Sequence, residues 1–208
     1  MDATLLIRSW RFWLAAIILG GVLSCSAIII LGNGLSDLSQ RPTREALASL
    51  TPLREICGGG PGQAEAPGLQ DGPGPHPTVL FRSRIAGEDL TAYYIRNDDL
   101  PEDWRATKIA VAEMVVCAHA EVVIVEECQY TLENGVSAVM QRVQWVSRVV
   151  VHDARSGAVL DQGYVEGTLP RECQDSETFS GSLTTQQVAG EHPTPEVIAA
   201  WLEPRIVR

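Results

Sequence analysis

The chain has 208 residues, of which 45% are hydrophobic and 20% are charged, and its 16 Lys and Arg against 26 Asp and Glu give a formal net charge of −10. This acidic balance argues against nucleic acid as a partner, because phosphates need a basic surface, and against docking of a polybasic face on anionic lipid. The length suits a single domain. The 18 Gly and 12 Pro are clustered, which predicts that part of the chain is a linker.

The N-terminal region contains an uncharged, apolar stretch that predicts a transmembrane helix over residues 12–34. Its first twenty residues would form a helix of about 30 Å, which matches the hydrocarbon core of a bilayer. Trp10 and Trp13 lie at its start, where aromatic side chains favour the membrane interface. The lipid bilayer is therefore an expected partner of the chain.

The distribution of arginines around this stretch predicts the topology. Arg8 and Arg11 directly precede it, whereas the first basic residues after it are Arg41 and Arg44. By the positive-inside rule, residues 1–11 are cytoplasmic and the chain after the span is extracytoplasmic. The alternative is the reverse topology, in which the rest of the chain is a regulatory adaptor that faces the cytoplasm.

A second alternative concerns Cys25. The sequence Val22-Leu23-Ser24-Cys25 resembles the lipobox of bacterial lipoproteins, in which Cys25 would become the lipidated first residue. The apolar run continues past Cys25, whereas a mature lipoprotein usually becomes polar at once. We therefore favour an uncleaved signal anchor, with lipidation at Cys25 as the alternative.

Residues 35–77 are predicted to be a juxtamembrane segment followed by a Gly/Pro-rich linker. A short helix is expected over residues 43–57, interrupted by Pro52. Residues 58–77 contain twelve Gly or Pro in twenty positions and little that could fill a core. We expect them to be a flexible spacer.

Residues 78–208 are expected to form an extracytoplasmic β-rich domain of the α+β class, an antiparallel meander with one C-terminal helix. Strands are predicted over residues 78–85, 90–95, a run that ends at 117, 121–130, 136–153 and 158–168. Thr194-Pro195-Glu196 has the form of a helix N-terminus, and Pro204 is expected to stop that helix.

Two hairpin turns set the expected register of the long strands. Asn134-Gly135 and Ser156-Gly157 suit two-residue turns, because such residues adopt positive φ at little cost. Residue i then faces residue 269 − i or 313 − i. The buried face is predicted to hold Val122, Ile124, Cys128, Tyr130, Val139, Val143, Trp145, Val149, Val151, Leu160 and Tyr164. The opposite, solvated face is predicted to hold Arg142, Gln144, Arg148 and His152.

The cysteines outside the span are disulfide candidates, since they are even in number and expected in an oxidising compartment: Cys57, Cys117, Cys128 and Cys173. The predicted register places Cys128 opposite Gln141, at the same end of the sheet as Cys173. We predict a Cys128–Cys173 bond if Pro170 turns the chain across the long strand. Otherwise the two would lie about 9–10 Å apart, beyond disulfide reach. Free buried cysteines are the alternative.

No metal, cofactor or catalytic residue is predicted. Cys117, His119 and Cys128 lack the paired short spacings of a zinc site, so His119 is expected in a turn and His152 on the solvated face. No phosphate-binding glycine loop or dinucleotide motif occurs. The hydroxyl-rich loop at residues 178–182 lacks the G-x-S-x-G elbow.

Two adjacent acids do not form a catalytic pair. Glu126 and Glu127 lie in one expected strand, so their side chains point to opposite faces and cannot share a site. Glu126 falls on the buried side, where we expect it to have a partner.

Several short motifs carry a resemblance over about residues 79–205. They are Leu100-Pro101, Arg105-Ala106, Val115-Val116-Cys117, Cys128-Gln129-Tyr130, Asp153-Ala154-Arg155-Ser156-Gly157, Gly167, Pro170-Arg171, Cys173, and Trp201-Leu202 before Pro204. With these motifs the C-terminal part resembles an uncharacterised bacterial family of exported or membrane-tethered domains. The resemblance implies a small β-rich domain with paired cysteines and brings no known activity.

These patterns together predict a single-pass membrane protein whose extracytoplasmic domain has a binding or structural role. The expected partner is an unknown protein or envelope ligand, because no arrangement for nucleophilic, acid–base or metal chemistry is visible. The alternative is a membrane-anchored hydrolase or thiol-redox enzyme that uses Cys117 or Cys173, although the chain has no C-x-x-C motif.

Overall fold

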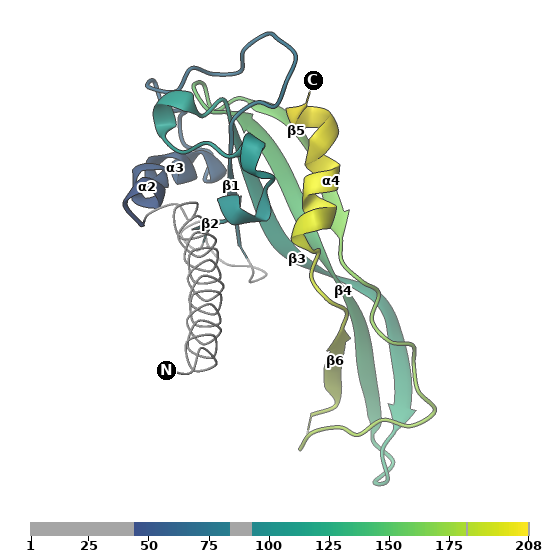
Figure 1. Cartoon of the computed structure of the whole chain (residues 1–208). Coiled ribbons are helices and arrows are strands. Elements are labelled where there is room, and N and C mark those ends of the chain that lie inside the picture. The colour runs from purple at the N-terminus through teal and green to yellow at the C-terminus, as the bar shows by residue number, and fades with distance from the viewer. Residues whose placement is uncertain (1–43, 84–92, 182, 208) are drawn as a thin grey trace, which may run out of the picture. The chain divides into compact units, whose positions relative to one another are not determined.

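The structure is a computed structural model that describes residues 44–83, 93–181 and 183–207 (Figure 1). These residues belong to one compact unit, 44–208. The predicted transmembrane helix at residues 12–34, together with Cys25, lies outside the described residues. No helix in the described part of the chain is both long and apolar enough to cross a bilayer.

A mixed β-sheet forms the centre of this unit (Figure 1). Its strands are β1 (Thr78–Arg82), β2 (Tyr94–Ile95), β3 (Met114–Thr131), β4 (Ser137–Asp153), β5 (Val159–Glu166) and β6 (Thr185–Ala189). They are ordered β2-β1-β3-β4-β5, and β6 pairs with the part of β4 that β5 leaves free. The meander β3-β4-β5 is antiparallel as predicted, but β1 pairs with β3 and β6 with β4 in parallel, so the sheet is mixed.

Helical segments precede the sheet, interrupt it and end the chain. They are α2 (Arg44–Ser49), η1 (Thr51–Leu53), α3 (Arg54–Cys57), η3 (Asn97–Asp99), η4 (Glu102–Trp104), η5 (Ile109–Val111) and α4 (Pro195–Ile206). Helix α4 begins after Thr194 as predicted but continues two residues past Pro204. Its last turn persists because Ile206 is fully buried in the core.

Helix α4 covers one face of the sheet. Ile198, Leu202 and Ile206 are at most 1% exposed. They form one buried cluster with sheet residues that include Leu80, Met114, Val116, Val149 and Val151. The helix therefore packs on the side of β4 for which a buried face was predicted.

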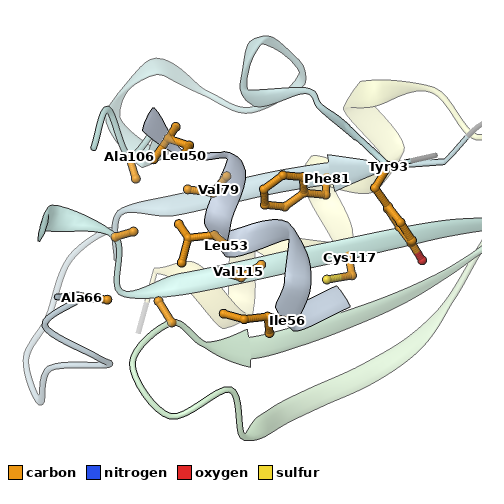
Figure 2. Close-up of a cluster of buried hydrophobic side chains, with 12 residues drawn as sticks. Leu50, Leu53, Ile56, Ala66, Val79, Phe81, Tyr93, Ala106, Val115 and Cys117 are labelled. Atoms are coloured by element: carbon orange, nitrogen blue, oxygen red, sulfur yellow. The ribbon is translucent and has the colours of Figure 1, made fainter. Parts of the chain in front are cut away.

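The opposite face of the sheet is covered by the segment that precedes β1 (Figure 2). The buried cluster on this face includes Leu50, Leu53, Ile56, Val79, Phe81 and Val115. A disulfide between Cys57 and Cys117 joins α3 to β3, with the two Cα atoms 5.5 Å apart. The prediction that this face is solvated is wrong here, because α3 and its neighbours exclude water from it. His152 is accordingly only 8% exposed.

Residues 58–77, which we predicted to be a flexible spacer, also lie against the sheet. The backbone N–H of Leu69 donates to the carboxylate of Asp153 at 2.7 Å. A Cβ on Gly62 would lie 2.3 Å from the carbonyl oxygen of Arg155, so glycine permits a close backbone approach there. These contacts place the segment in the same compact unit as the sheet, which corrects the predicted boundary at residue 78.

The first hairpin exists, but its loop is longer than predicted. The N–H of Leu132 donates to the carbonyl of Val136, so residues 133–135 form the loop, in which Gly135 adopts a φ of 78°. Cys128 therefore faces Met140 and not Gln141. A β-bulge between Ile124 and Glu126 then shifts the register of the inner part of the hairpin by one more residue.

The second hairpin is also longer, because Asp153 and Ala158 close its loop. Arg148 consequently faces Tyr164, one residue from the expected partner. A one-residue shift turns every side chain of the strand to the other face. Leu160 and Tyr164, predicted to be buried, are therefore 42% and 60% exposed, and Val165 is buried instead.

The hairpin of β3 and β4 extends beyond the covered part of the sheet (Figure 1). We call residues 120–145 and 167–190 the arm, and the other described residues the base. No described residue of the arm belongs to either buried cluster. The arm and the base must therefore be stabilised by different interactions.

Candidate functional site

A groove of about 410 Å³ opens in the base beside the Cys57–Cys117 disulfide. The end of α3 forms one wall, and β3, β4 and β5 form the floor. The polar side chains that line it are Tyr93, His119, Arg148, His152 and Gln162. Tyr93 and Cys117 lie at one end of the hydrophobic cluster under α3 (Figure 2).

Strand register places Arg148 in the middle of the floor. Arg148 in β4 faces His119 in β3 and Tyr164 in β5. Directly paired residues share a face, with Cβ atoms about 4.5–5.5 Å apart. Tyr93, just before β2, places its ring centroid 6.1 Å from that of His119. The Arg148 side chain therefore belongs to a row that also contains two tyrosines and a histidine.

Arg148 is exposed, and its guanidinium forms no hydrogen bond or ion pair with any described residue. Five other arginines of this unit bind carboxylates within the protein: Arg82, Arg96, Arg142, Arg171 and Arg205. An arginine side chain offers a planar set of five N–H donors that matches a carboxylate. Arg148 is therefore available to an anionic group that enters the groove.

The two histidines of the groove differ in whether their ring Nδ1 atom has a hydrogen-bond partner. His152 Nδ1 lies 3.0 Å from the carbonyl oxygen of Gly157, which requires a proton on Nδ1 and leaves Nε2 for a ligand. His119 Nδ1 is buried and has no hydrogen-bond partner among the described residues. An unsatisfied buried polar atom costs about 1–3 kcal/mol, so a ligand or water bonded to His119 would recover this energy.

Neither histidine lies where it was expected. His119 was predicted in a turn and lies inside β3, because the two strands expected on either side of it are one continuous strand. His152 was predicted on a solvated face, which α3 covers. No sequence pattern indicated the groove, since Tyr93, His119 and Arg148 come from three separate segments.

Tyr93 adds a neutral donor to the site. The side chain is only 5% exposed, and burial raises the pKa of its hydroxyl. The nearby Arg148 charge opposes this rise in pKa, while Glu121 adds to it. The phenol therefore stays protonated at neutral pH and can donate a hydrogen bond.

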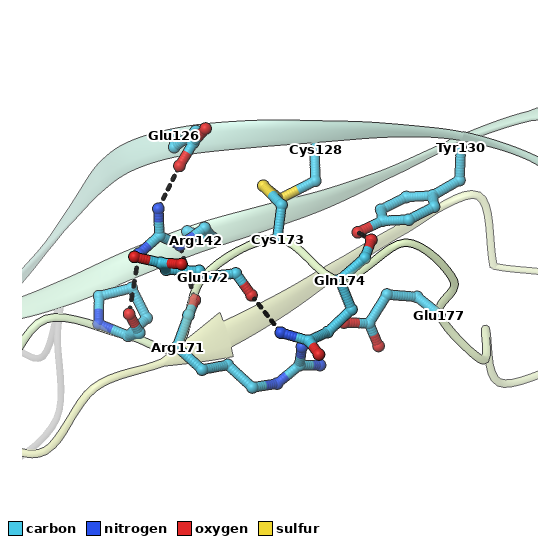
Figure 3. The surroundings of a disulfide bond; sticks show 10 residues. Glu126, Cys128, Tyr130, Arg142, Arg171, Glu172, Cys173, Gln174 and Glu177 are labelled. Atoms are coloured by element: carbon cyan, nitrogen blue, oxygen red, sulfur yellow. Dashed lines mark hydrogen bonds and ion pairs between the residues drawn. A yellow bond between two sulfur atoms is a disulfide. The ribbon is translucent and has the colours of Figure 1, made fainter.

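The predicted disulfide between Cys128 and Cys173 is present in the arm, with Cα atoms 5.8 Å apart (Figure 3). Arg142 in β4 donates to the carbonyls of Pro170 and Arg171 at 2.9 and 2.7 Å. The chain thus crosses β4 after Pro170, which is the condition on which the disulfide prediction depended. The hydroxyl of Tyr130 continues the contact by donating to the Gln174 carbonyl at 2.9 Å.

The two glutamates and the hydroxyl-rich loop have structural partners. Glu126 forms an ion pair with Arg142, so it has the partner that was expected. It is exposed, however, because the bulge turns it to the face of Arg142 and not to the predicted buried face. Glu127 accepts a hydrogen bond from Gln141. Phe179 of the loop packs edge-on against Tyr130, with ring centroids 5.7 Å apart. These residues therefore stabilise the arm.

Within the described part of the chain, no three His, Cys, Asp or Glu side chains gather to hold a metal ion. Cys117 and Cys173, the nucleophiles of the enzyme alternative, are both disulfide-bonded. The pairing of Cys57 with Cys117 could not be chosen from the sequence, because Cys57 was placed just before a spacer and away from the sheet.

No protein family, characterised protein or solved structure matches the chain. The role of the groove must therefore be argued from its own residues. The resemblance to exported bacterial domains stays a prediction.

Proposed function

We propose that residues 44–208 form an extracytoplasmic binding domain, tethered by a membrane helix at residues 12–34, whose groove binds a ligand with a carboxylate. The observation that carries the proposal is the exposed Arg148 guanidinium, which has no partner among the described residues. It lies in a row of hydrogen-bonding aromatic side chains in a groove of about 410 Å³.

The chemistry of the groove favours a carboxylate as the anchored group. A guanidinium binds a carboxylate through two parallel N–H donors, which gives orientation as well as affinity. Tyr93 and His119 supply further donors at one side of Arg148.

Nearby acids limit the charge of the ligand. Glu121 and Glu166 both face Val146, two positions along β4 from Arg148 and on the same face. A polyanion would meet these carboxylates as well as the net charge of −10. Because salt screens charges beyond about 8–10 Å, a single carboxylate placed on Arg148 is affected mainly by its immediate neighbours. The site therefore suits a ligand with one carboxylate.

A probe that differs only in charge tests this assignment. N-acetylglycine carries one carboxylate, and N-acetylglycinamide is its neutral counterpart. We expect saturable binding of N-acetylglycine to the full chain in detergent by saturation-transfer difference NMR, with a free energy of about −4 kcal/mol, and no binding of the amide. Arg148→Gln should abolish this binding.

Lys108→Gln is the matched control, because it removes one positive charge from an exposed residue that does not line the groove. This variant should bind N-acetylglycine as the parent does. Equal binding of both probes, or unchanged binding by Arg148→Gln, would contradict the proposal.

The disulfides support the extracytoplasmic part of the proposal. Two bonds in one small unit are typical of an oxidising compartment. They also leave Cys117 and Cys173 without free thiols, which favours a binding role over a thiol-redox enzyme.

The topology has its own test because Lys108 is the only lysine of the chain and is exposed. A membrane-impermeant amine reagent should modify Lys108 in intact cells as fully as in lysed cells, as measured by mass spectrometry of the Lys108 peptide. Modification only after lysis would instead support a cytoplasm-facing adaptor.

A further inference from the structure

Along the arm, the outer edge of β3 pairs with no strand in the described part of the chain. Strand β1 accompanies β3 only as far as Ala118, whose carbonyl accepts the N–H of Ser83. From residue 119 to 131, no described strand pairs with this edge. An open edge presents a row of backbone donors and acceptors to other chains.

The direction of these backbone groups follows from the pairing with β1. Met114 donates its N–H to the segment before β1, and Ala118 accepts from the residue after it, so the even-numbered residues of β3 point toward the β1 side. The alternation along a strand extends this pattern to Ala120, Val122 and Ile124. Their N–H and C=O groups therefore face outward, while those of the odd-numbered residues face β4.

The side chains along this edge are apolar and exposed. Val123, Ile124 and Val125 are 45%, 50% and 39% exposed. Glu121 and Glu126 bracket this β-branched run. Natural proteins usually protect such an edge, and here the bulge at Val125 and the two acids provide only partial protection.

We propose that the β3 edge from Ala120 to Ile124 binds an extended, basic segment of a partner protein as an added strand. Backbone hydrogen bonds to Ala120, Val122 and Ile124 would supply affinity. Glu121 would select Lys or Arg in the partner. The bulge ends the regular edge after Ile124, so the paired segment spans about five residues, or about 17 Å.

Charge argues against a second copy of this chain as the occupant. Antiparallel pairing of two such edges about a two-fold axis through the outward-facing Val122 would place the two Glu121 side chains on one face as diagonal neighbours, about 7–8 Å apart, where their like charges repel. Each copy also carries a net charge of −10. A basic strand meets neither obstacle and is attracted by the same acids.

The test uses the full chain in detergent and a fluorescent, acetylated seven-residue peptide of alternating lysine and valine. The control peptide replaces lysine by glutamate. We expect the lysine peptide to bind by fluorescence anisotropy, with an affinity that falls as salt is raised, and to slow hydrogen exchange at residues 120–124. The glutamate peptide should not bind.

Two variants of one residue separate backbone pairing from charge attraction. Val122→Pro removes an outward-facing N–H without removing a β3–β4 hydrogen bond. It should lower the affinity for the lysine peptide at least tenfold. Val122→Thr keeps the N–H and should bind within about twofold of the parent. Formation of the Cys128–Cys173 bond, checked by mass spectrometry, shows that the arm of each variant is intact.

Glu121→Lys gives an independent readout that does not depend on the proline variant. It should lower the affinity for the lysine peptide and allow the glutamate peptide to bind. Arg148→Gln removes a positive charge near Glu121, so it should not weaken binding of the lysine peptide, whereas it should abolish binding of N-acetylglycine. The edge and the groove can therefore fail separately. Unchanged binding by Val122→Pro, peptide protection outside residues 120–124, or protection of this edge through concentration-dependent self-association would overturn the proposal.

Discussion

The base and the arm share β3 and β4 but stabilise them in different ways. In the base, a hydrophobic cluster covers each face of the sheet, and Leu53, Phe81 and Leu202 are completely buried. In the arm, the Cys128–Cys173 bond and the Arg142 contacts hold one segment across an otherwise thin sheet. Where hydrophobic cover ends, covalent and polar contacts take its place, and the outer edge of β3 has no partner strand among the described residues.

The largest expected effects come from removing each disulfide. The two bonds span 60 and 45 residues, so the chain-entropy model gives each about 4 kcal/mol and a difference of only about 0.3 kcal/mol. We expect Cys57→Ala with Cys117→Ala to lower the free energy of unfolding of the whole unit. Cys128→Ala with Cys173→Ala should mainly open the arm.

Hydrogen exchange by mass spectrometry distinguishes these outcomes. Amides of α4 should lose protection in the base variant and keep most of it in the arm variant, whereas amides of residues 120–145 should lose protection in both. Equal loss in α4 for the two variants would show that the base and the arm unfold as one unit.

Leu53→Ala tests whether the segment before β1 belongs to the base. Leu53 is 0% exposed, so truncation should lower the free energy of unfolding by about 2–5 kcal/mol through lost burial and a cavity. Guanidinium titration followed by far-UV circular dichroism measures this change. Leu69→Ala, at a residue 43% exposed, is the control and should cost less than about 1 kcal/mol. An equally small effect of Leu53→Ala would place the segment outside the cooperative unit.

Arg142→Lys tests how much the polar contacts of Arg142 stabilise the arm. Lysine keeps the charge opposite Glu126 but cannot form the same donor pattern toward the two carbonyls of the crossing segment. We expect a local destabilisation of about 1–2 kcal/mol, seen as faster hydrogen exchange at residues 170–174. Arg105→Lys is matched in the base, where Arg105 Nε donates to the Leu100 carbonyl at 2.8 Å. Because hydrophobic packing dominates in the base, Arg105→Lys should speed local hydrogen exchange less than Arg142→Lys does. A larger effect of Arg105→Lys would contradict the view that polar contacts stabilise the arm more than the base.

The smallest expected effect concerns pH and Asp153, which links the β4–β5 loop to the segment before β1. Burial alone would raise the pKa of Asp153, but hydrogen bonds from Ser156, Leu69 and Arg155 outweigh it, so the folded-state pKa is lowered. The carboxylate therefore stabilises the fold above its unfolded pKa of about 4, and this contribution is lost as pH falls through the folded pKa.

Asp153→Asn should thus cost about 1 kcal/mol at pH 7, since solvent screens part of the interaction, and almost nothing near pH 2. Thermal unfolding of the parent and the variant across this pH range measures the difference. A cost that stays constant with pH would show that the charge of Asp153 is not what stabilises the loop.

Local sequence patterns predicted much of the sheet and little of the site. The strands β3, β4 and β5 follow from β-branched runs separated by Gly-containing turns, and Thr194-Pro195 marks the start of α4. The register failed by one residue at each turn, because Gly135 and Gly157 fit several loop lengths equally well. A single-residue error was enough to place Tyr164 on the wrong face.

The groove was beyond prediction for a different reason. Its polar side chains come from a residue before β2 and from three strands, and only pairing brings Tyr93, His119 and Arg148 together. Composition also misled the assignment of residues 58–77, since glycine and proline favour a flexible chain in isolation but also permit close packing against a preformed sheet.

The sequence by itself determined the α+β character, the antiparallel meander and the C-terminal helix, because each depends on local periodicity. It predicted the bond between Cys128 and Cys173 only on the condition that the chain crosses β4 after Pro170, which the structure supplied. Only the tertiary structure decided that the segment before β1 covers the second face of the sheet, that Cys57 pairs with Cys117, and that Arg148 lies unpaired in a groove. These features depend on contacts between distant segments, whose free energy is a sum over packing that no local pattern encodes.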